Sequence, residues 1–278
     1  MKYILFNGLS NSNKGEESAN EAFEKFGEGT EKVDIVGLDV KEWISGLTEQ
    51  DTVILCGGDG TINRFANDCY SEKLPCPILL YKAGTGNDFL RDISENYEKE
   101  EVPEINKYIE NLPTVKVKDI DCHYINGIGF GIDGKCCEVA DRMKEEGKTD
   151  INYAGIAIKL LLFKYKCPTA TITIDGEEKI FKKVWFASAM NGRYYGGGMK
   201  AAPEQDRLSD KLSAVVWYGG GKIGTLMNFP NIFKGTHIKS KHVYVTTAKE
   251  ITVKFDSPMA LQIDGETVLD VTEYTARK

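Results

Sequence analysis

The sequence lacks most features that mark secreted, membrane-spanning or nucleic-acid-binding proteins. Its seven cysteines are an odd number without a C-x-x-C pair, which indicates reduced thiols in a cytoplasmic protein. The start, MKYILF, becomes polar at Asn7, too early for a signal-peptide core. The longest apolar run, AGIAIKLLLF, is about half of a membrane span. The net charge of −7 argues against a broad basic face for nucleic acid. We therefore expect a soluble, cytoplasmic protein that binds no nucleic acid.

Several common catalytic motifs are also missing. The sequence has no G-x-x-x-x-G-K-[ST], no G-x-G-x-x-G after the first expected strand, and no G-x-S-x-G. Its three histidines, His123, His237 and His242, show neither zinc-ligand spacing nor the context of a catalytic triad. The remaining chemistry rests on carboxylates, glycine turns and a few lysines. That set suits phosphoryl transfer with Mg²⁺, where catalysis is mostly positioning and charge neutralisation.

The patterning divides the 278 residues into two domains. Over 1–118, short apolar strands alternate with amphipathic helices, which is typical of a parallel sheet with helices on its faces. Over 119–270, strands follow one another with few helices, which favours an antiparallel β-sandwich. The expected strands of the first domain are 3–6, 33–36, 52–56 and 78–81, and its expected helices are 16–26, 40–47, 62–70 and 103–111. The expected strands of the second are a hairpin in TATITIDGEEKIF and 184–188, 212–218, 243–246, 251–255 and 259–263.

Four clusters of glycine and polar residues follow expected strands: NGLSNSNKG from Asn7, CGGDGTIN from Cys56, AGTGNDFLR from Ala83, and QIDGE from Gln262. Glycine allows sharp turns and lets the backbone approach a ligand closely, and backbone N–H groups at a helix start bind phosphate. An N-capping loop or an ordinary strand-to-helix turn explains any one of the first three. Three on one edge of one parallel sheet indicate a phosphate-bearing ligand. QIDGE by itself is a standard Asp-Gly hairpin turn.

Three motifs together carry a resemblance to a known family. GGDGTIN at 57–63, GTGNDFLR at 84–91 and GGGMKAAPEQDRLSDKLS at 196–213 resemble the bacterial diacylglycerol kinase-like lipid kinases, whose superfamily includes sphingosine kinases and, more distantly, NAD kinases. NGIGFGID at 126–133 is similar to the lipid branch. The resemblance implies an ATP-binding α/β domain, a β-sandwich that binds the lipid, and an active site in the cleft between them. It allows the last residues, 271–278, to return to the first domain.

The resemblance also implies roles for individual residues, with ATP and Mg²⁺ as cofactors. Asp59 would act through Mg²⁺ at the β- and γ-phosphates. Glu266 would be the general base that takes the proton of a lipid hydroxyl, and Asp133 would support that site. The nucleotide would be held by Asn7, Gly8, Leu9, Ser10, Asn11, Gly58, Asp59, Gly60, Thr61, Ile62, Asn63, Arg64 and Thr85.

A second, structural Mg²⁺ is implied at the loop 207–212. Asp210 would bind it by its side chain, and Arg207 and Leu212 by their backbone carbonyls. Oxygen ligands suit such a hard cation. The residues alone do not distinguish Asp210 from Asp206 in this role.

The sequence departs from the family pattern at two places. The family's first loop usually reads Asn-Pro-x-x-Gly, but here Gly8 and Asn11 stand at the proline and glycine positions. Asn11 can replace glycine because asparagine tolerates left-handed backbone. The family's GGDGTxNE ends in glutamate, whereas this sequence has Arg64. That reversed charge either adds a phosphate contact or weakens Mg²⁺ handling.

Two segments suggest transient contact with an anionic membrane surface. Residues 212–249 contain no Asp or Glu but five lysines, interleaved with aromatic and aliphatic side chains. The stretch AIKLLLFKYK at 157–166 has a similar character. Lysines near an anionic leaflet favour binding, although a core helix with solvated lysines gives the same pattern.

The preferred interpretation is a lipid kinase that phosphorylates a hydroxyl such as that of diacylglycerol, without a phospho-enzyme. A nucleotide kinase of the NAD kinase type and an ATP-binding sensor without turnover are the alternatives. The identity of the lipid stays open, because apolar pockets discriminate poorly between related chains. The family contains homodimers, and the sequence shows no interface.

Overall fold

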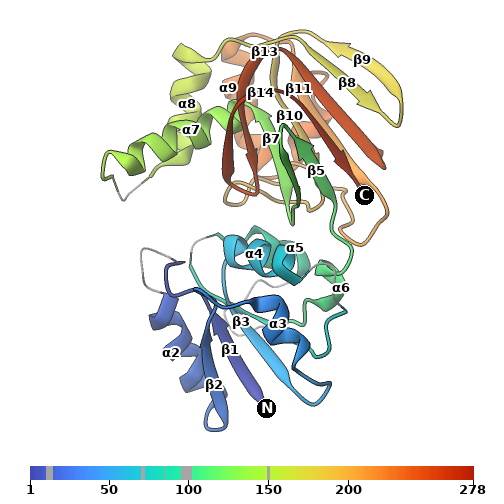
Figure 1. Ribbon diagram of the computed structural model, residues 1–278. Helices are drawn as coiled ribbons and strands as arrows, with labels where there is room; N and C mark the ends of the chain where they lie inside the picture. The colour runs from blue at the N-terminus through green and yellow to red at the C-terminus, as the bar shows by residue number, and fades with distance from the viewer. Residues whose placement is uncertain (11–14, 70–72, 85, 95–101, 149–150) are drawn as a thin grey trace. The chain divides into compact units, whose positions relative to one another are not determined.

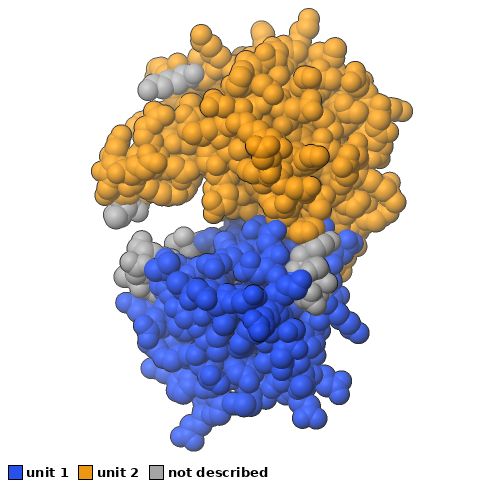
Figure 2. Space-filling model, in the orientation of Figure 1, with its two compact units in different colours: residues 1–112 blue, residues 113–278 orange. Residues whose placement is uncertain are grey.

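The computed structural model describes residues 1–10, 15–69, 73–84, 86–94, 102–148 and 151–278. The chain forms two compact units, Met1–Leu112 and Pro113–Lys278 (Figure 2). Within the described residues, no helix is long and apolar enough to cross a membrane.

Unit 1 is built on a parallel four-stranded sheet in the order β2-β1-β3-β4 (Figure 1). β1, β3 and β4 are largely apolar, whereas the edge strand β2 reads TEKVD and is mostly exposed. β3 is buried over its last five residues, as expected for a central strand covered on both faces. The strands are β1 (Lys2–Phe6), β2 (Thr30–Asp34), β3 (Thr52–Gly57) and β4 (Ile78–Lys82). The expected parallel sheet is confirmed, with β2 beginning three residues earlier than predicted.

Helices cover both faces of this sheet because side chains along a strand alternate between faces. Ile4 and Phe6 pack against α2 (Gly15–Phe26) through Ala19 and Ala22. Tyr3 points to the other face, where its ring lies 5.4 Å from that of Trp43 in α3. The remaining helices are α3 (Val40–Ser45), α4 (Asp59–Cys69), α5 (Asp88–Ile93) and α6 (Asn106–Ile109).

Unit 2 is an antiparallel β-sandwich, as predicted. Its strand order is β12-β11-β10-β7-β13-β14-β5-β6, with β8 paired to β13 and to β9. The long strand β13 pairs with β8 through its first half and with β7 through its last three residues, and the register shifts between the two halves. The strands are β5 (Thr114–Val117), β6 (Ile120–His123), β7 (Gly127–Gly131), β8 (Ala170–Ile174), β9 (Glu177–Phe181), β10 (Val184–Met190), β11 (Leu212–Tyr218), β12 (Val243–Ala248), β13 (Glu250–Ile263) and β14 (Glu266–Arg277).

Two apolar cores hold unit 2 together. One lies within the sandwich, where Phe130 stacks on Phe255 at 4.0 Å and meets the edge of Tyr274. The other lies between the sheet and the helical segments, around Trp185 and Trp217. Those segments are α7 (Ile132–Glu145), α8 (Tyr153–Lys159), the π-helix η1 (Leu160–Lys164), α9 (Lys222–Asn228), and the 3₁₀ helices η2 (Phe229–Ile232) and η3 (Thr236–Lys239).

The division between the units differs from the expected boundary at 118/119. Strand β5 begins at Thr114 and pairs with β14 and β6, so residues 113–118 belong to unit 2. Residues 271–278, which were allowed to return to the first domain, instead lie in unit 2. Thr275, Ala276 and Arg277 pair with both β13 and β5, which fixes this end of the strand in the sandwich.

Candidate active site

The first glycine loop, Asn7–Ser10, lies at the carboxyl end of β1 and is held by hydrogen bonds. The Gly8 N–H donates to Oδ1 of Asp34 at 3.0 Å, and the Leu9 N–H donates to Oδ1 of Asn7 at 3.1 Å. A Cβ on Gly15 would lie 1.9 Å from the Asn7 carbonyl oxygen, so only glycine lets α2 start this close to the loop. The loop is thus fixed beside the N-terminus of a twelve-residue helix. Asn11 lies outside the described residues.

The second and third glycine loops touch each other through their backbones. A Cβ on Gly58 would lie 2.4 Å from the Gly86 carbonyl oxygen, and that oxygen accepts a hydrogen bond from the Asp59 N–H at 2.9 Å. The Asn87 side chain donates to the Gly84 carbonyl at 3.0 Å and closes the third loop. These glycines therefore bring the ends of β3 and β4 together. Thr85 lies outside the described residues.

The Asp59 carboxylate joins the second loop to α5. Its Oδ2 accepts from the Asp88 N–H at 2.8 Å, and its Oδ1 accepts from the Phe89 N–H at 3.0 Å. These are N–H groups of the first turn of α5, which has no capping bond from the side chain at its own N-cap, Asn87. Asp59 therefore caps a helix that lies 29 residues further along the chain.

The other residues of GGDGTINR divide between the core and the surface. Ile62 is buried, and Thr61 packs so closely under Gly57 that a Cβ there would lie 2.4 Å from the Thr61 Cβ. Asn63 accepts a hydrogen bond from Asn67 on the next turn of α4. Gly60 and Arg64 are exposed, and the Arg64 Nε lies 3.8 Å from Oδ2 of Asp68. The side chains of Thr61 and Ile62 thus support the turn from within.

In unit 2, three glycines place Asp133 at the start of α7. A Cβ on Gly129 would lie 2.7 Å from both the Asp133 Cβ and Nε2 of Gln262. A Cβ on Gly134 would lie 2.0 Å from the Ala260 carbonyl oxygen of β13. Gly131 has a φ of +110°, which L side chains rarely adopt. The spacing of glycines in GIGFGIDG therefore lets the helix pack directly on the sheet with its carboxylate beneath it.

Asp133 is a partly buried residue whose carboxyl group has hydroxyl partners. Tyr195 and Ser188 both donate hydrogen bonds to its Oδ2, the second at 3.5 Å. Burial raises the pKa of Asp133 to about 6, and the two hydroxyls oppose that rise. Perturbed carboxyl groups of this kind cluster at functional sites. Asp133 thus changes charge close to neutral pH.

Glu266 begins β14 after the Asp264-Gly265 turn and is exposed. Within the described residues, no hydrogen bond or ion pair involves its carboxylate. Asp264 instead accepts hydrogen bonds from the backbone N–H groups of residues 125–127, at 2.5 to 2.9 Å, and so fixes the turn. Burial raises the pKa of Cys137 to about 12, and the charges of Asp133, Asp141 and Glu266 add to that rise. The charges of the expected base and of the expected supporting carboxylate thus both act on the pKa of Cys137.

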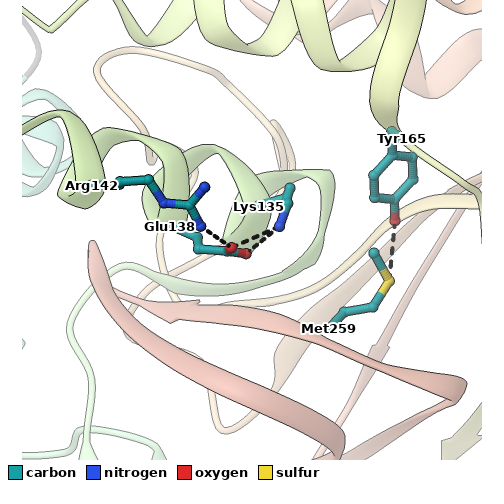
Figure 3. A network of polar contacts seen from close by, with 5 residues as sticks. All are labelled: Lys135, Glu138, Arg142, Tyr165 and Met259. Carbon is teal, nitrogen blue, oxygen red and sulfur yellow. Dashed lines mark hydrogen bonds and ion pairs between the residues drawn. The ribbon is translucent and has the colours of Figure 1, made fainter.

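The outer side of α7 carries an ion-pair network (Figure 3). The Glu138 carboxylate accepts from Lys135 at 2.6 and 2.7 Å and from Arg142 at 3.2 Å. In the same view the Tyr165 hydroxyl points to the Met259 sulfur, 3.7 Å away. These charges of α7 therefore neutralise one another, whereas Asp133 in the first turn of the helix has hydroxyl partners.

The residues expected to bind a structural Mg²⁺ do not form a cation site in this arrangement. The Arg207 carbonyl oxygen accepts from the Lys278 ammonium at 2.8 Å, so a lysine cation already contacts this expected ligand. The exposed Asp210 carboxylate pairs with Lys249 at 2.9 Å, and Leu212 is buried at the start of β11. No group of three His, Cys, Asp or Glu side chains in the described part of the chain is placed to hold a metal.

A nucleotide-borne Mg²⁺ makes a smaller demand on the protein. Such an ion keeps several waters and phosphate oxygens and needs only one or two carboxylates. Asp59 supplies one such carboxylate, at the turn between β3 and α4.

The fold and these loops define a two-domain protein of the diacylglycerol kinase type, and comparisons with known proteins agree. Residues 2–123 match the family model of the diacylglycerol kinase catalytic domain. Residues 126–275 match that of the YegS C-terminal NAD kinase beta sandwich-like domain. The chain belongs to the diacylglycerol kinase-like lipid kinase family.

Individual relatives are similar over most of the chain. A protein of Staphylococcus haemolyticus that is named as a lipid kinase is 29% identical to this chain. The match covers 80% of this chain and 72% of the Staphylococcus protein. A diacylglycerol kinase of Mycobacterium tuberculosis is 26% identical, over 81% of this chain and 75% of its own. The crystal structure of a diacylglycerol kinase from Bacillus anthracis has the same fold, with a TM-score of 0.66 at 16% identity, covering 100% of this chain and 94% of that one.

Several residues of the site were not found by sequence reasoning. Tyr195 and Ser188, the partners of Asp133, lie in stretches without a motif that pairs them with a carboxylate 55 or more residues away. Lys278, which donates to the Arg207 carbonyl and to Oδ1 of Asn191, also has no local signal. Asp264 was within reach, because the quoted QIDGE motif contains it.

Proposed function

We propose that this protein is an ATP- and Mg²⁺-dependent kinase that transfers the γ-phosphate directly to the hydroxyl of a lipid such as diacylglycerol. The observation that supports this most is the contact between Gly58 and Gly86 under the Asp59 carboxylate. Backbone loops without side chains at the carboxyl edge of a parallel sheet are suited to phosphate.

Unit 1 would bind the nucleotide. The loop Asn7–Ser10 and the backbone of the exposed Gly60 turn would lie along its phosphates, beside the N-termini of α2 and α4. Asp59 would keep the two loops in place through Asp88 and Phe89 while facing the phosphates. Mg²⁺, when bound to the β- and γ-phosphates, neutralises the charge that develops during transfer.

Unit 2 would supply the base for the acceptor. Glu266, which is exposed, would take the proton of a lipid hydroxyl, and a positioned base typically contributes about 10²–10⁴-fold to the rate. Asp133, held by Tyr195 and Ser188, would support that site as a second acidic group of unit 2.

The test is transfer of labelled γ-phosphate from ATP in the presence of Mg²⁺ to a panel of lipid alcohols in mixed micelles, with NAD as a further acceptor. The proposal expects a labelled lipid whose formation is lost in Glu266→Gln. Labelled NADP without a labelled lipid would instead make the protein a nucleotide kinase.

Arg64 motivates a second candidate, an ATP-binding sensor without turnover. Its positive charge stands where the family has a glutamate, on the exposed side of α4. ATP binding with no product from any acceptor would favour this candidate over catalysis.

A further inference from the structure

Unit 2 exposes four large apolar side chains on two of its helical segments. The exposed fraction is 40% for Ile158 in α8, 76% for Phe163 in η1, and 74% and 75% for Ile223 and Met227 in α9. Ile223 and Met227 are four residues apart and so share one face of their helix. These four residues are called the apolar patch below.

The two segments that carry the patch are adjacent although they lie 60 residues apart in sequence. The Lys222 ammonium at the start of α9 donates to the Leu162 carbonyl oxygen of η1 at 3.1 Å. Leu226 of α9 packs against the same buried cluster that contains Leu160 and Leu161. The patch is therefore one surface made by both segments.

The fold does not need the patch for its core. Ile156, Ala157, Leu160 and Leu161 already turn the inner sides of α8 and η1 into the core, and all four are buried. Thr225 does the same for α9. Apolar side chains on the outer side of such helices indicate a surface that contacts another apolar partner.

The charges around the patch point to an anionic environment. Neither 151–174 nor 212–249 contains an Asp or Glu, although the whole chain has a net charge of −7. On α7, which packs against α8, Glu138 and Asp141 are both in ion pairs with lysine or arginine. The exposed cations of 151–174 and 212–249 include Lys159, Lys166, Lys222, Lys234 and Lys239.

We propose that the apolar patch docks on the surface of an anionic lipid bilayer. Phe163, Ile223 and Met227 enter the boundary between headgroups and acyl chains, and the surrounding lysines face the lipid phosphates. This inference rests on the proposed function in one respect, since a kinase of membrane lipids meets its acceptor at a bilayer. The contact is reversible, because it involves a few side chains of short helical segments.

The experiment is flotation of the whole protein, without ATP, with vesicles of phosphatidylcholine alone or mixed with phosphatidylglycerol. The expected result is preferential binding to the anionic vesicles. The triple variant Phe163→Ser, Ile223→Ser, Met227→Ser is expected to bind about tenfold or more weakly. Lys159→Gln and Lys222→Gln are expected to weaken binding about fivefold each. The matched control is Ile180→Ser, because Ile180 is equally exposed but lies on the β9 edge of the sandwich.

Two further readouts separate this inference from the proposed function. Circular dichroism and the unfolding temperature show whether the triple variant is folded, and kinase activity with a short-chain, water-dispersed diacylglycerol is expected to be unchanged in it. Equal binding to both vesicle types, or unchanged binding of the folded triple variant, would overturn the docking surface. A third outcome would also overturn it: a wild-type protein that binds no vesicles and is oligomeric, together with a triple variant that is monomeric. The patch would then be an interface between copies of the protein. A wild-type protein that binds anionic vesicles but phosphorylates no lipid would overturn the proposed function and leave the docking surface standing.

Discussion

The Asp59 carboxylate lies 2.8 Å from the backbone nitrogen of Asp88 and caps α5 from the preceding glycine loop. Two of the three loops at the carboxyl edge of the sheet are thereby tied together by a charged hydrogen bond, which is stronger than a neutral one. A residue expected to serve a metal thus also shapes the loops in which a phosphate would lie.

Replacing Asp59 with Asn should lower both stability and ATP binding. The amide has only one acceptor oxygen, so the N–H group of either Asp88 or Phe89 loses its partner. We expect a loss of about 1–2 kcal/mol in the free energy of unfolding, typical of a lost helix cap. The measurement is denaturant unfolding together with ATP titration calorimetry. The control is Asp68→Asn, on the exposed side of α4, the helix that Asp59 begins; it should change neither stability nor ATP binding.

Asp133 should make stability depend on pH in a defined direction. Burial raises its pKa from an ordinary value of 3.8 to about 6, so the folded state holds the proton more tightly than the unfolded state. The resulting stability is complete below about pH 4 and is lost as the pH rises through 6, by about 3 kcal/mol in total.

The Asp133→Asn variant removes this dependence. The difference in unfolding free energy, wild type minus variant, should fall between pH 4 and pH 7 when measured by urea unfolding. Tyr195→Phe, which deletes a hydrogen bond that favours the carboxylate, should move the fall to higher pH. Parallel curves for wild type and Asp133→Asn would contradict the raised pKa.

Lys278 should stabilise unit 2 in place of a divalent cation. Its ammonium donates to Oδ1 of Asn191 at 2.6 Å and to the Arg207 carbonyl at 2.8 Å. Lys278→Met should lower the free energy of unfolding by about 1–3 kcal/mol, because two acceptors lose a charged donor. Lys249→Met, which breaks only the exposed pair with Asp210, should have little effect. Without nucleotide, Mg²⁺ and EDTA should leave the wild-type unfolding temperature equal; stabilisation by Mg²⁺ that Asp210→Asn abolishes would show a metal at this loop after all.

Arg64→Glu tests whether the reversed charge has disabled the protein. Arg64 is exposed, and its Nε lies 3.8 Å from Oδ2 of Asp68, one turn along α4. We therefore expect the turnover rate to change by less than about threefold, as for surface charges that are screened by solvent. Steady-state kinetics with saturating ATP is the measurement. A gain of several orders of magnitude would identify the wild type as a degenerate ATP binder.

Much of unit 1 was predictable because its signals are local. The run from Val53 to Cys56 followed by three glycines indicated a buried strand and a tight turn, and β3 and α4 follow that pattern. The partners of Asp59 were not predictable in the same way. They are the backbone N–H groups of Asp88 and Phe89, about 30 residues further along the chain. No spacing rule predicts which distant N–H group donates to a given carboxylate.

Two segments of unit 2 were harder to predict: the glycine-rich start of α7 and the charged strand β14. GIGFGIDG has the composition of a loop, yet its glycines serve close packing of β7 and α7 against β13. The four charged residues of ETVLDVTEYTAR do not alternate regularly with apolar ones, so its continuous strand β14 was not expected; Val271, Tyr274 and Ala276 are buried. Tertiary packing decided both segments against their local composition.

The most direct test of the account is γ-phosphate transfer by Glu266→Gln, measured beside its affinity for ATP. The account predicts that lipid phosphorylation falls at least about 100-fold, since a general base is lost. It also predicts that ATP affinity changes by less than about twofold, because Glu266 belongs to unit 2 and the glycine loops to unit 1. A variant that phosphorylates the lipid as fast as the wild type would contradict the assignment of Glu266 as the base.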